Sequence, residues 1–461
     1  MAAPRSPRCG SKPRAVARAA TTGGRRRRPT PPPRRASRRD EAPSNRAIVS
    51  VRVGLDELLA APELLRGRRY ALLAHQASLS ERFELAHVAL ARLGQPPSVL
   101  MGPEHGFFGV EQDMVAAAES TDPLTGIAVA SLYGDDEASL EPSPEAFSGL
   151  DLLVVDLQDI GSRYYTFVAT AVWAAQAALR AGCEVWVLDR PNPLGGTEVE
   201  GNLPEPGFES FVGAFRTPVR HGLTLAELVM LEARRRGWDE SALRVFPVSG
   251  WSRSDLVWWR RRPWVAPSPN MPSIAAALIY PGLCLLEATE LSEGRGTTRP
   301  FQLVGAPGLD PALVQRRLEA RLGALDDGSS QALRTVPALF RPQFQKHAGS
   351  VCGGVEIVVV APPPRPTRFG LELLTVLRRC AAESPQGFSW RRAPYEFRSD
   401  RPALDLLLGS SEPRQLLDRG GDVDEWVAGW AADEEEFRRE CLEREVFLYP
   451  HGRPPTPGER A

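Results

Sequence analysis

Short apolar segments alternate with helical patterns over residues 69–188, and this alternation constrains the fold more than any other feature of the chain. The predicted strands are Arg69–Leu73, Pro97–Met101, Ile127–Leu132, Leu152–Leu157 and Cys183–Leu188. The predicted helices between them are Glu81–Leu93 and Tyr165–Ala181. Strands that are apolar throughout are buried on both faces, as in a parallel sheet covered by helices. The segment therefore predicts an α/β, Rossmann-like, doubly wound N-terminal domain.

The pattern continues to the end of the first domain and then into a second, smaller α/β region. Thr224–Arg236 begins with a capping box, Thr224 and Glu227, and Leu243–Val248 has strand character. The later predicted elements are the helix Pro311–Leu322, the strand Val355–Val360, the helix Phe369–Cys380 and the acidic helix Asp422–Glu445. We expect a disordered basic tail over residues 1–46, the Rossmann-like domain over 47–305, and a C-terminal α/β domain over 306–461 that completes a cleft.

Charge is distributed unevenly along the chain. The first 40 residues hold Lys12 and 12 Arg against one acid, Asp40, so the rest carries a net charge of about −13 although the whole chain carries −1. An acidic body argues against nucleic acid as a ligand. No apolar run reaches the roughly 20 residues of a membrane-spanning helix. The tail also has no apolar stretch of the signal-peptide type.

Polar residues follow three of the predicted strands. Met101 is followed by Gly-Pro-Glu104-His105-Gly106, Leu157 by Gln158-Asp159-Ile-Gly-Ser-Arg163-Tyr164, and Leu188 by Asp189-Arg190-Pro-Asn192. In open parallel sheets, ligands bind beyond the carboxyl ends of the strands. A cap, a turn or a local ion pair explains any one cluster. Three clusters at one edge favour a binding site, because grouped polar side chains are costly to desolvate.

Three later segments have the composition of binding loops. They are Pro218-Val-Arg220-His221-Gly222, the turn that presents Asn270, and the glycine-rich string Ser292-Glu293-Gly294-Arg295-Gly296-Thr297. Glycines in such a string allow the backbone to approach a ligand. The alternative for each segment is a plain structural loop or turn.

Familiar cofactor and hydrolase signatures are missing. No G-x-G-x-x-G string follows the first strand, so we expect no nicotinamide cofactor, and there is no P-loop, H-E-x-x-H or G-x-S-x-G string. The six His show no metal-ligand spacing, although a metal-dependent hydrolase that uses Asp156, Asp159, Asp189 and His221 is one alternative. Carboxylates, Arg, amides and aromatics suit sugar chemistry, in which one group protonates the leaving oxygen and a second stabilises or attacks the anomeric carbon.

Six strings resemble, in order, the bacterial exo-β-N-acetylmuramidases once grouped as a domain of unknown function. They are GPEHGFFG, DLQDIGSRYYTF, VLDRPNPLGG, PVRHGLTLAEL, PSPNMPS and SEGRGTTRPF. The resemblance spans about residues 50–450. It implies a glycosidase of cell-wall recycling that releases N-acetylmuramic acid from the non-reducing end of peptidoglycan fragments, without a cofactor. It suggests a periplasmic or extracellular location, which contrasts with the tail. One departure is Ala74-His75-Gln76, where the family has an Asn.

Carried over by position, the resemblance makes Glu104 the catalytic carboxyl group, as general acid or acid/base. The candidates for the second group are Glu293, then Asp159, or the acetamido group of the substrate itself. Arg163, Arg220 and Arg295 are candidates to bind the lactyl carboxylate of muramic acid. The remaining expected substrate-binding residues are His105, Gln158, Tyr164, Asp189, Arg190, Asn192, His221, Asn270 and Thr297. The runner-up function is a sugar-binding protein without catalytic activity.

Overall fold

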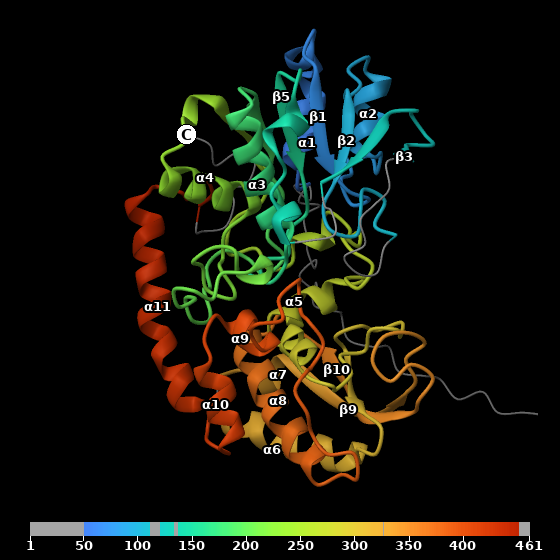
Figure 1. Cartoon of the computed structure of the whole chain (residues 1–461), viewed down its shortest axis with the longest axis vertical. Coiled ribbons are helices and arrows are strands. Elements are labelled where there is room, and N and C mark those ends of the chain that lie inside the picture. Colours follow the sequence, from blue (N-terminus) through green and yellow to red (C-terminus); the bar gives the residue numbers. More distant parts are fainter. Residues whose placement is uncertain (1–49, 111–119, 133–136, 326, 451–461) are drawn as a thin grey trace, which may run out of the picture. The chain divides into compact units, whose positions relative to one another are not determined.

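The computed structural model describes residues 50–110, 120–132, 137–325 and 327–450, so the predicted basic tail lies outside it. Its first sheet has the strand order β3-β4-β2-β1-β5-β6-β7 (Figure 1). All neighbours pair in parallel except β3, which is antiparallel to β4. The strands are β1 (Tyr70–Ala74), β2 (Val99–Gly102), β3 (Ser120–Thr121), β4 (Ala128–Ser131), β5 (Leu152–Asp156), β6 (Glu184–Leu188) and β7 (Leu243–Phe246).

Both faces of this sheet are buried, because alternate residues of a strand point to opposite sides. In β1, Ala71 and Leu73 belong to one apolar cluster, and Tyr70 and Leu72 to another. The first cluster includes α3 (Phe167–Arg180) and α4 (Leu225–Arg236), and the second includes α1 (Gly54–Ala60) and α2 (Ala86–Arg92). Helices thus cover the two faces, which confirms the predicted α/β, doubly wound class.

Local sequence explains where these helices begin. Thr224 accepts a hydrogen bond from the backbone N–H of Glu227, whose own side chain bonds back to Thr224, so the predicted capping box starts α4. Helix α2 begins at Ala86 and not at Glu81, because the preceding residues form a turn. Phe83 has a φ of 59°, and Leu79 and Leu85 form an isolated antiparallel bridge.

The second sheet is antiparallel, with the order β8-β10-β9. Its strands are β8 (Leu303–Ala306), β9 (Leu333–Phe340) and β10 (Cys352–Val359). The helices of this region are α5 (Ile274–Leu283), α6 (Pro311–Leu325), α7 (Ser329–Ala332), α8 (Pro366–Ala382), α9 (Ala403–Leu408), α10 (Glu412–Asp418) and α11 (Asp424–Glu443). The 3-10 helices among the described residues are η1 (Pro62–Leu65), η2 (Glu137–Leu140), η3 (Pro144–Phe147), η4 (Phe211–Gly213), η5 (Glu240–Ala242), η6 (Trp258–Arg260) and η7 (Cys284–Ala288).

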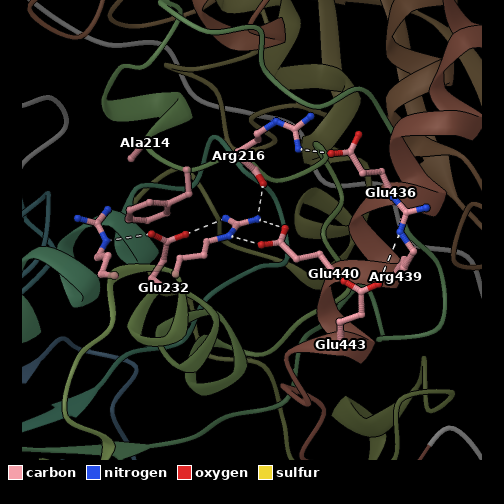
Figure 2. A pocket seen from close by; sticks show the side chains of 10 residues that line it. Ala214, Arg216, Glu232, Glu436, Arg439, Glu440 and Glu443 are labelled. Atoms are coloured by element: carbon pink, nitrogen blue, oxygen red, sulfur yellow. Dashed lines mark hydrogen bonds and ion pairs between the residues drawn. The ribbon is translucent and has the colours of Figure 1, made fainter.

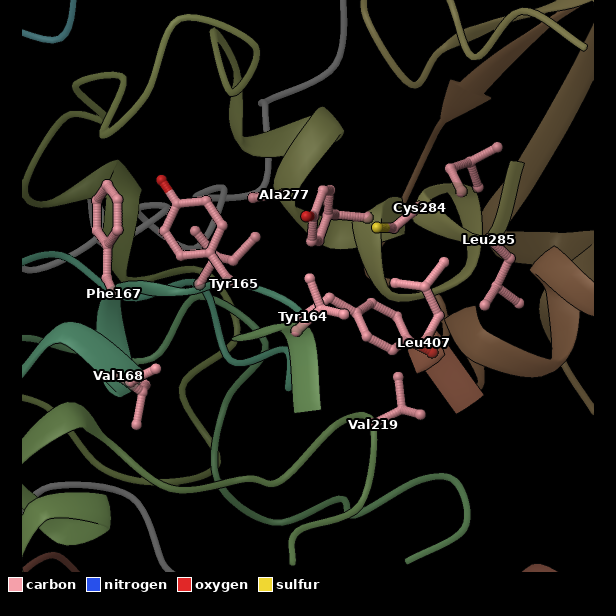
Figure 3. Close-up of a cluster of buried hydrophobic side chains, with 14 of the residues drawn as sticks. Tyr164, Tyr165, Phe167, Val168, Val219, Ala277, Cys284, Leu285 and Leu407 are labelled. Carbon is pink, nitrogen blue, oxygen red and sulfur yellow. The ribbon is translucent and has the colours of Figure 1, made fainter. Parts of the chain in front are cut away.

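One apolar cluster continues from the first sheet into this second region. Figure 3 shows Tyr164 and Tyr165 of the loop before α3, and Phe167 at the start of α3, packed near side chains of α5, η7 and α9. Tyr165 contacts Tyr280 of α5 edge-on, with ring centroids 6.0 Å apart. The predicted boundary at residue 305 falls within β8; the domain limits stay a prediction.

Helices α5 and α8 pack with their backbones in close approach. A Cβ atom on Gly282 would lie 2.0 Å from the carbonyl oxygen of Pro366, and one on Gly370 would lie 2.2 Å from the Cα of Gly282. Helix α5 was not predicted from the sequence. It is apolar almost all round and contains Pro281, so it lacks both the amphipathic period and the composition of an ordinary helix.

This close approach makes Gly370→Ala destabilising. Alanine favours a helix interior by about 1 kcal/mol over glycine, but its methyl group here meets backbone atoms that have to move, at a cost of roughly 1–3 kcal/mol. We expect a lower free energy of unfolding by urea denaturation. The matched control is Gly429→Ala in α11, where a Cβ would meet nothing within 4 Å, and this variant is expected to be more stable. A stabilised Gly370→Ala variant would contradict the packing.

The last described segment returns to the carboxyl edge of the first sheet. The Tyr449 hydroxyl donates to Asp189 Oδ2 (2.5 Å), directly after β6. The amide of Leu448 donates to Glu227 Oε1 (2.9 Å), and Glu227 also binds the guanidinium of Arg253 (2.6 Å); both charged groups are fully buried. Burial raises the pKa of Asp189 to about 7, although hydrogen bonds from Tyr449, Thr224 and Ala226 oppose the rise.

Asp189 therefore couples stability to pH. Its folded pKa of about 7 exceeds the unfolded value of about 3.9, so between these values the unfolded chain loses a proton that the folded chain retains. Stability then falls as pH rises through this window, by up to about 4 kcal/mol. Asp189→Asn cannot titrate, so its unfolding free energy is expected to fall less over the same range. Parallel pH profiles for the two proteins would contradict this assignment.

Candidate active site

The order of the first sheet brings the predicted polar loops to one edge. From β1 the chain adds β2 and β4 on one side, and then β5, β6 and β7 on the other. The carboxyl ends of β2, β1, β5 and β6 are therefore neighbours, around the switch point where ligands bind in such sheets. Glu104 follows β2, Asp159 follows β5, and Asp189 follows β6.

A polar pocket lies beside this edge and is closed by residues from the second region. It is lined by Glu104, His105, Tyr164, Tyr165, Thr166, Phe167, Val212, Ser268, Asn270, Met271, Tyr280, Glu287, Arg295, Phe301, Tyr395 and Glu396. Five of the expected site residues are among them: Glu104, His105, Tyr164, Asn270 and Arg295. The pocket thus contains three carboxyl groups, two of which stand at positions that the sequence did not single out.

A tight turn places Glu104 in the pocket. The amide of Gly106 donates to the carbonyl of Pro103 (3.0 Å), and His105 and Gly106 both have positive φ, 70° and 75°. A Cβ on Gly102 would lie 2.2 Å from the nitrogen of Phe107, so this turn requires glycine where it leaves β2. The backbone strain at His105 is of the kind that concentrates at functional sites.

Two neighbouring side chains lie at the carboxyl group of Glu104. The Thr166 hydroxyl donates to Glu104 Oε2 (2.6 Å), and His105 Nε2 lies 3.9 Å from Oε1. The carboxyl side chain is 16% exposed, so it is accessible yet largely shielded from water. Thr166 is the residue directly before α3, and its side chain makes no cap hydrogen bond. It was missed from the sequence because the predicted helix Tyr165–Ala181 placed it inside the helix.

Arg295 anchors the opposite wall of the pocket. Its Nη2 donates to Glu287 Oε1 (2.6 Å), its Nε lies 3.8 Å from Glu293 Oε1, and the Tyr395 hydroxyl donates to Glu287 Oε2 (3.0 Å). Burial opposes the charge of Arg295, but the carboxylates of Glu287 and Glu293 outweigh it and raise its pKa further. Arg295 therefore stays a guanidinium cation inside the pocket.

Glu293, the first expected second carboxyl, is not among the residues that line the pocket. Its Oε2 accepts from Lys346 Nζ (2.9 Å), which also donates to the carbonyls of Leu286 and Leu291. Burial resists ionisation of Glu293, but the charges of Lys346 and Arg295 prevail and lower its pKa. Its role in the structure is to hold two cations in place.

Asp159, the other expected second group, faces His221 behind the pocket. The amide of Leu223 donates to His221 Nδ1 (3.1 Å), so the neutral ring carries its proton on Nε2, which is 3.6 Å from Asp159 Oδ2. Asp159 also accepts from the amide of Gly161 (2.7 Å). Both side chains are almost fully buried.

Two of the three expected arginines are engaged by the protein itself. Arg163 donates to the carbonyls of Asn202, Thr217 and Leu407 at 2.7–2.8 Å. Arg220 donates to the carbonyls of Leu194 and Pro364 at 2.5 and 2.9 Å. Burial lowers the pKa of both, to about 10 for Arg163. They connect loops of the two regions and do not line the pocket.

The remaining expected residues also lie outside the pocket. Asn192 bonds the amide of Leu194 and the carbonyl of Leu223, Thr297 donates to the carbonyl of Gly294, and Asp189 binds Tyr449. Gln158 and Arg190 line a different hollow, beside Trp258 and Trp264. Arg190 is paired there with Asp156 (2.6 Å). The carboxylates of the alternative metal site thus have other partners, and within the described residues no group of three or more His, Cys, Asp or Glu is arranged for a metal.

A larger hollow lies between α4 and α11 (Figure 2). Its charged side chains neutralise one another: Arg235 pairs with Glu440 (2.5 Å) and Glu232 (2.8 Å), and Arg216 pairs with Glu436 (2.6 Å). The Arg235–Glu440 pair joins α4 to α11, and the Arg216–Glu436 pair joins the loop before α4 to α11. The hollow holds none of the expected site residues, so the smaller pocket around Glu104 is the candidate active site.

Comparisons with known proteins agree over nearly the whole described chain. The family model "Exo-beta-N-acetylmuramidase NamZ, N-terminal" matches residues 70–275, and its C-terminal counterpart matches residues 278–449. The peptidoglycan beta-N-acetylmuramidase NamZ of Bacillus subtilis (strain 168) is 33% identical over 395 residues, which are 84% of this chain and 89% of that protein. No helix among the described residues is long and apolar enough to cross a membrane.

Two solved structures, both of DUF1343 family proteins from Bacteroides fragilis NCTC 9343, share the fold. One is 26% identical with a TM-score of 0.74, covering 87% of this chain and 100% of the other. The second is 25% identical with a TM-score of 0.64, covering 87% of this chain and 99% of the other. The resemblance carried by the six sequence strings is thereby confirmed: the chain belongs to the exo-β-N-acetylmuramidase NamZ family.

Proposed function

We propose that this protein is a glycoside hydrolase that removes N-acetylmuramic acid from the non-reducing end of peptidoglycan fragments. Membership of the family and the name of the Bacillus subtilis relative support the substrate class. The observation that carries the chemistry is the pocket that is lined by both Glu104 and Arg295. Hydrolysis of a glycoside consumes only water, so the proposed reaction requires no cofactor.

Glu104 is the proposed catalytic carboxyl group of this reaction. Glycoside cleavage needs a proton for the leaving oxygen and a negative charge near the anomeric carbon as the bond breaks. Glu104 is accessible from the pocket, oriented by Thr166, and followed by His105 in a strained turn. The rings of Tyr164 and Tyr165 lie beneath the same pocket, where they are buried in the main apolar cluster and form its apolar base.

Arg295 is the proposed recognition group for muramic acid. Muramic acid differs from glucosamine by a lactyl ether that carries a carboxylate, which a guanidinium binds well. Among the three expected arginines, Arg295 lines the pocket, whereas Arg163 and Arg220 donate to backbone carbonyls. Its Nε has no hydrogen-bond partner among the described residues, although it is buried.

The first test is the release of N-acetylmuramic acid from a muramyl-glucosamine disaccharide. Glu104→Gln preserves the shape of the side chain but removes its proton and charge, so turnover is expected to fall by about 10²–10⁴-fold or more. The matched control is Glu63→Gln, at an exposed carboxyl near the start of the chain, and it is expected to keep full activity. Circular dichroism and thermal denaturation check the fold. Full activity of Glu104→Gln would refute the assignment, and binding without release by the wild type would indicate a sugar-binding protein.

The second test concerns the lactyl carboxylate. Arg295→Lys retains the charge but loses the two-pronged guanidinium, and a charge-assisted hydrogen bond contributes about 1.5–3 kcal/mol. The affinity for N-acetylmuramic acid is therefore expected to fall roughly 10–100-fold by calorimetry, whereas the affinity for N-acetylglucosamine changes little. Arg299→Lys, at an exposed arginine of the same loop, serves as control. An equal loss of affinity for both sugars would mean that Arg295 does not bind the lactyl carboxylate.

A further inference from the structure

A turn in the second region presents Glu396 to the pocket in a costly backbone conformation. The amides of Tyr395 and Arg398 each donate to the carbonyl of the other, both at 2.9 Å, and enclose a two-residue turn. Its two residues, Glu396 and Phe397, have φ values of 48° and 65°. Such turns normally contain Asn and Gly, because other side chains are strained there by about 1–3 kcal/mol each.

The surrounding contacts hold this turn in place. The Tyr395 hydroxyl is fixed on Glu287, and the Arg391 guanidinium lies over the Tyr395 ring, 5.4 Å from its centroid. Phe397 packs against the main apolar cluster. The strain is therefore maintained by packing on both sides of Glu396, and its effect is to direct that carboxyl group into the pocket that also contains Glu104.

Glu396 is a half-buried acid for which the described residues supply no ion pair. Its Oε2 is buried and has no hydrogen-bond partner among the described residues. Burial, and then the negative charges of Glu104 and Glu287, raise its pKa well above the ordinary value, and the charges of Arg295 and Arg391 only partly oppose this. A structural carboxylate would have an ion pair or several donors, as Glu293 has in Lys346.

We propose that Glu396 is the second catalytic carboxyl group of the site, and that it forms with Glu104 a pair that holds one proton. The proposal rests on the glycosidase function proposed above. It replaces the two groups expected from the sequence, since Glu293 is bound by Lys346 and Arg295, and Asp159 faces His221 outside the pocket.

The chemistry of such a pair requires only the glycoside and water. As the glycosidic bond breaks, its electrons go to the leaving oxygen, which takes the proton of the pair. Both carboxyl groups are then ionised and stabilise the positive charge at the anomeric carbon. Water adds to that carbon and returns one proton to the pair, so the site regains its starting state. Burial and then the neighbouring negative charges raise the pKa of Glu396, so the proton of the pair resides there before the reaction.

Kinetics of Glu396→Gln test the catalytic part. We expect kcat for muramyl disaccharide to fall at least about 100-fold with KM changed less than about threefold, and one limb of the pH profile of kcat/KM to disappear. The midpoint of thermal denaturation is expected to stay equal or to rise, because a half-buried acid without an ion pair is removed. The control is Glu290→Gln, at an exposed carboxyl close to the same wall. Wild-type turnover in Glu396→Gln, or a large loss of stability with kcat and the pH profile unchanged, would overturn the proposal.

Infrared spectroscopy of the free protein tests the shared proton without any substrate. At about pH 6.5 an ordinary glutamate is ionised, whereas the pair retains one protonated carboxyl band. The difference spectrum against Glu396→Gln is expected to show the loss of that band, and the spectrum against Glu104→Gln a shift of it, because burial of Glu396 persists while its charged neighbour is gone. Asp189→Asn is expected to remove a separate band. An unchanged band in Glu396→Gln would overturn the pair. If the wild type released no sugar from muramyl substrates, the proposed function and the catalytic part of this proposal would fail, while the infrared result would still decide whether the two acids share a proton.

Discussion

The parallel pairing of β1 with both β2 and β5 is the constraint on which the rest of the structure depends. It places the carboxyl ends of neighbouring strands at one edge of the sheet. At that edge, successive strands switch from one side of β1 to the other. The turn after β2 then has to leave the sheet steeply, which requires Gly102 and gives His105 its positive φ. Glu104 is exposed to the pocket as a consequence of this geometry.

The second region completes the site through buried charges. Arg163 and Arg220 fix loops by donating to backbone carbonyls, and Glu287, Glu293, Arg295 and Lys346 form one ionic cluster along the pocket wall. Each of these charges is matched by donors or by an opposite charge, as burial requires. Glu396 has no such match among the described residues, and it lines the same pocket as Glu104. A carboxyl group without an ion-pair partner, in the same pocket as a proposed catalytic carboxyl group, is expected where the reaction needs a protonated acid.

Sequence periodicity was sufficient to predict the α/β class, because the strands of the first sheet are short, apolar and separated by helices. It also placed Glu104, His105, Tyr164, Asn270 and Arg295 among the candidates, since polar strings between apolar elements are visible in one dimension. Glu396 was not predicted, because its turn contains neither Asn nor Gly and so has no recognisable sequence pattern. Only the tertiary fold brings Glu396 into the same pocket as Glu104. Similarly, the sequence could not show that Arg163 binds carbonyl oxygens, since every residue offers such an acceptor.

The most direct test of the account is a crystal structure of Glu104→Gln with an intact muramyl-glucosamine disaccharide. The account predicts that the glycosidic oxygen lies between residue 104 and Glu396, with the lactyl carboxylate at the guanidinium of Arg295. A disaccharide bound in the hollow between α4 and α11, or beside Trp258 and Arg190, would contradict the assignment of the active site.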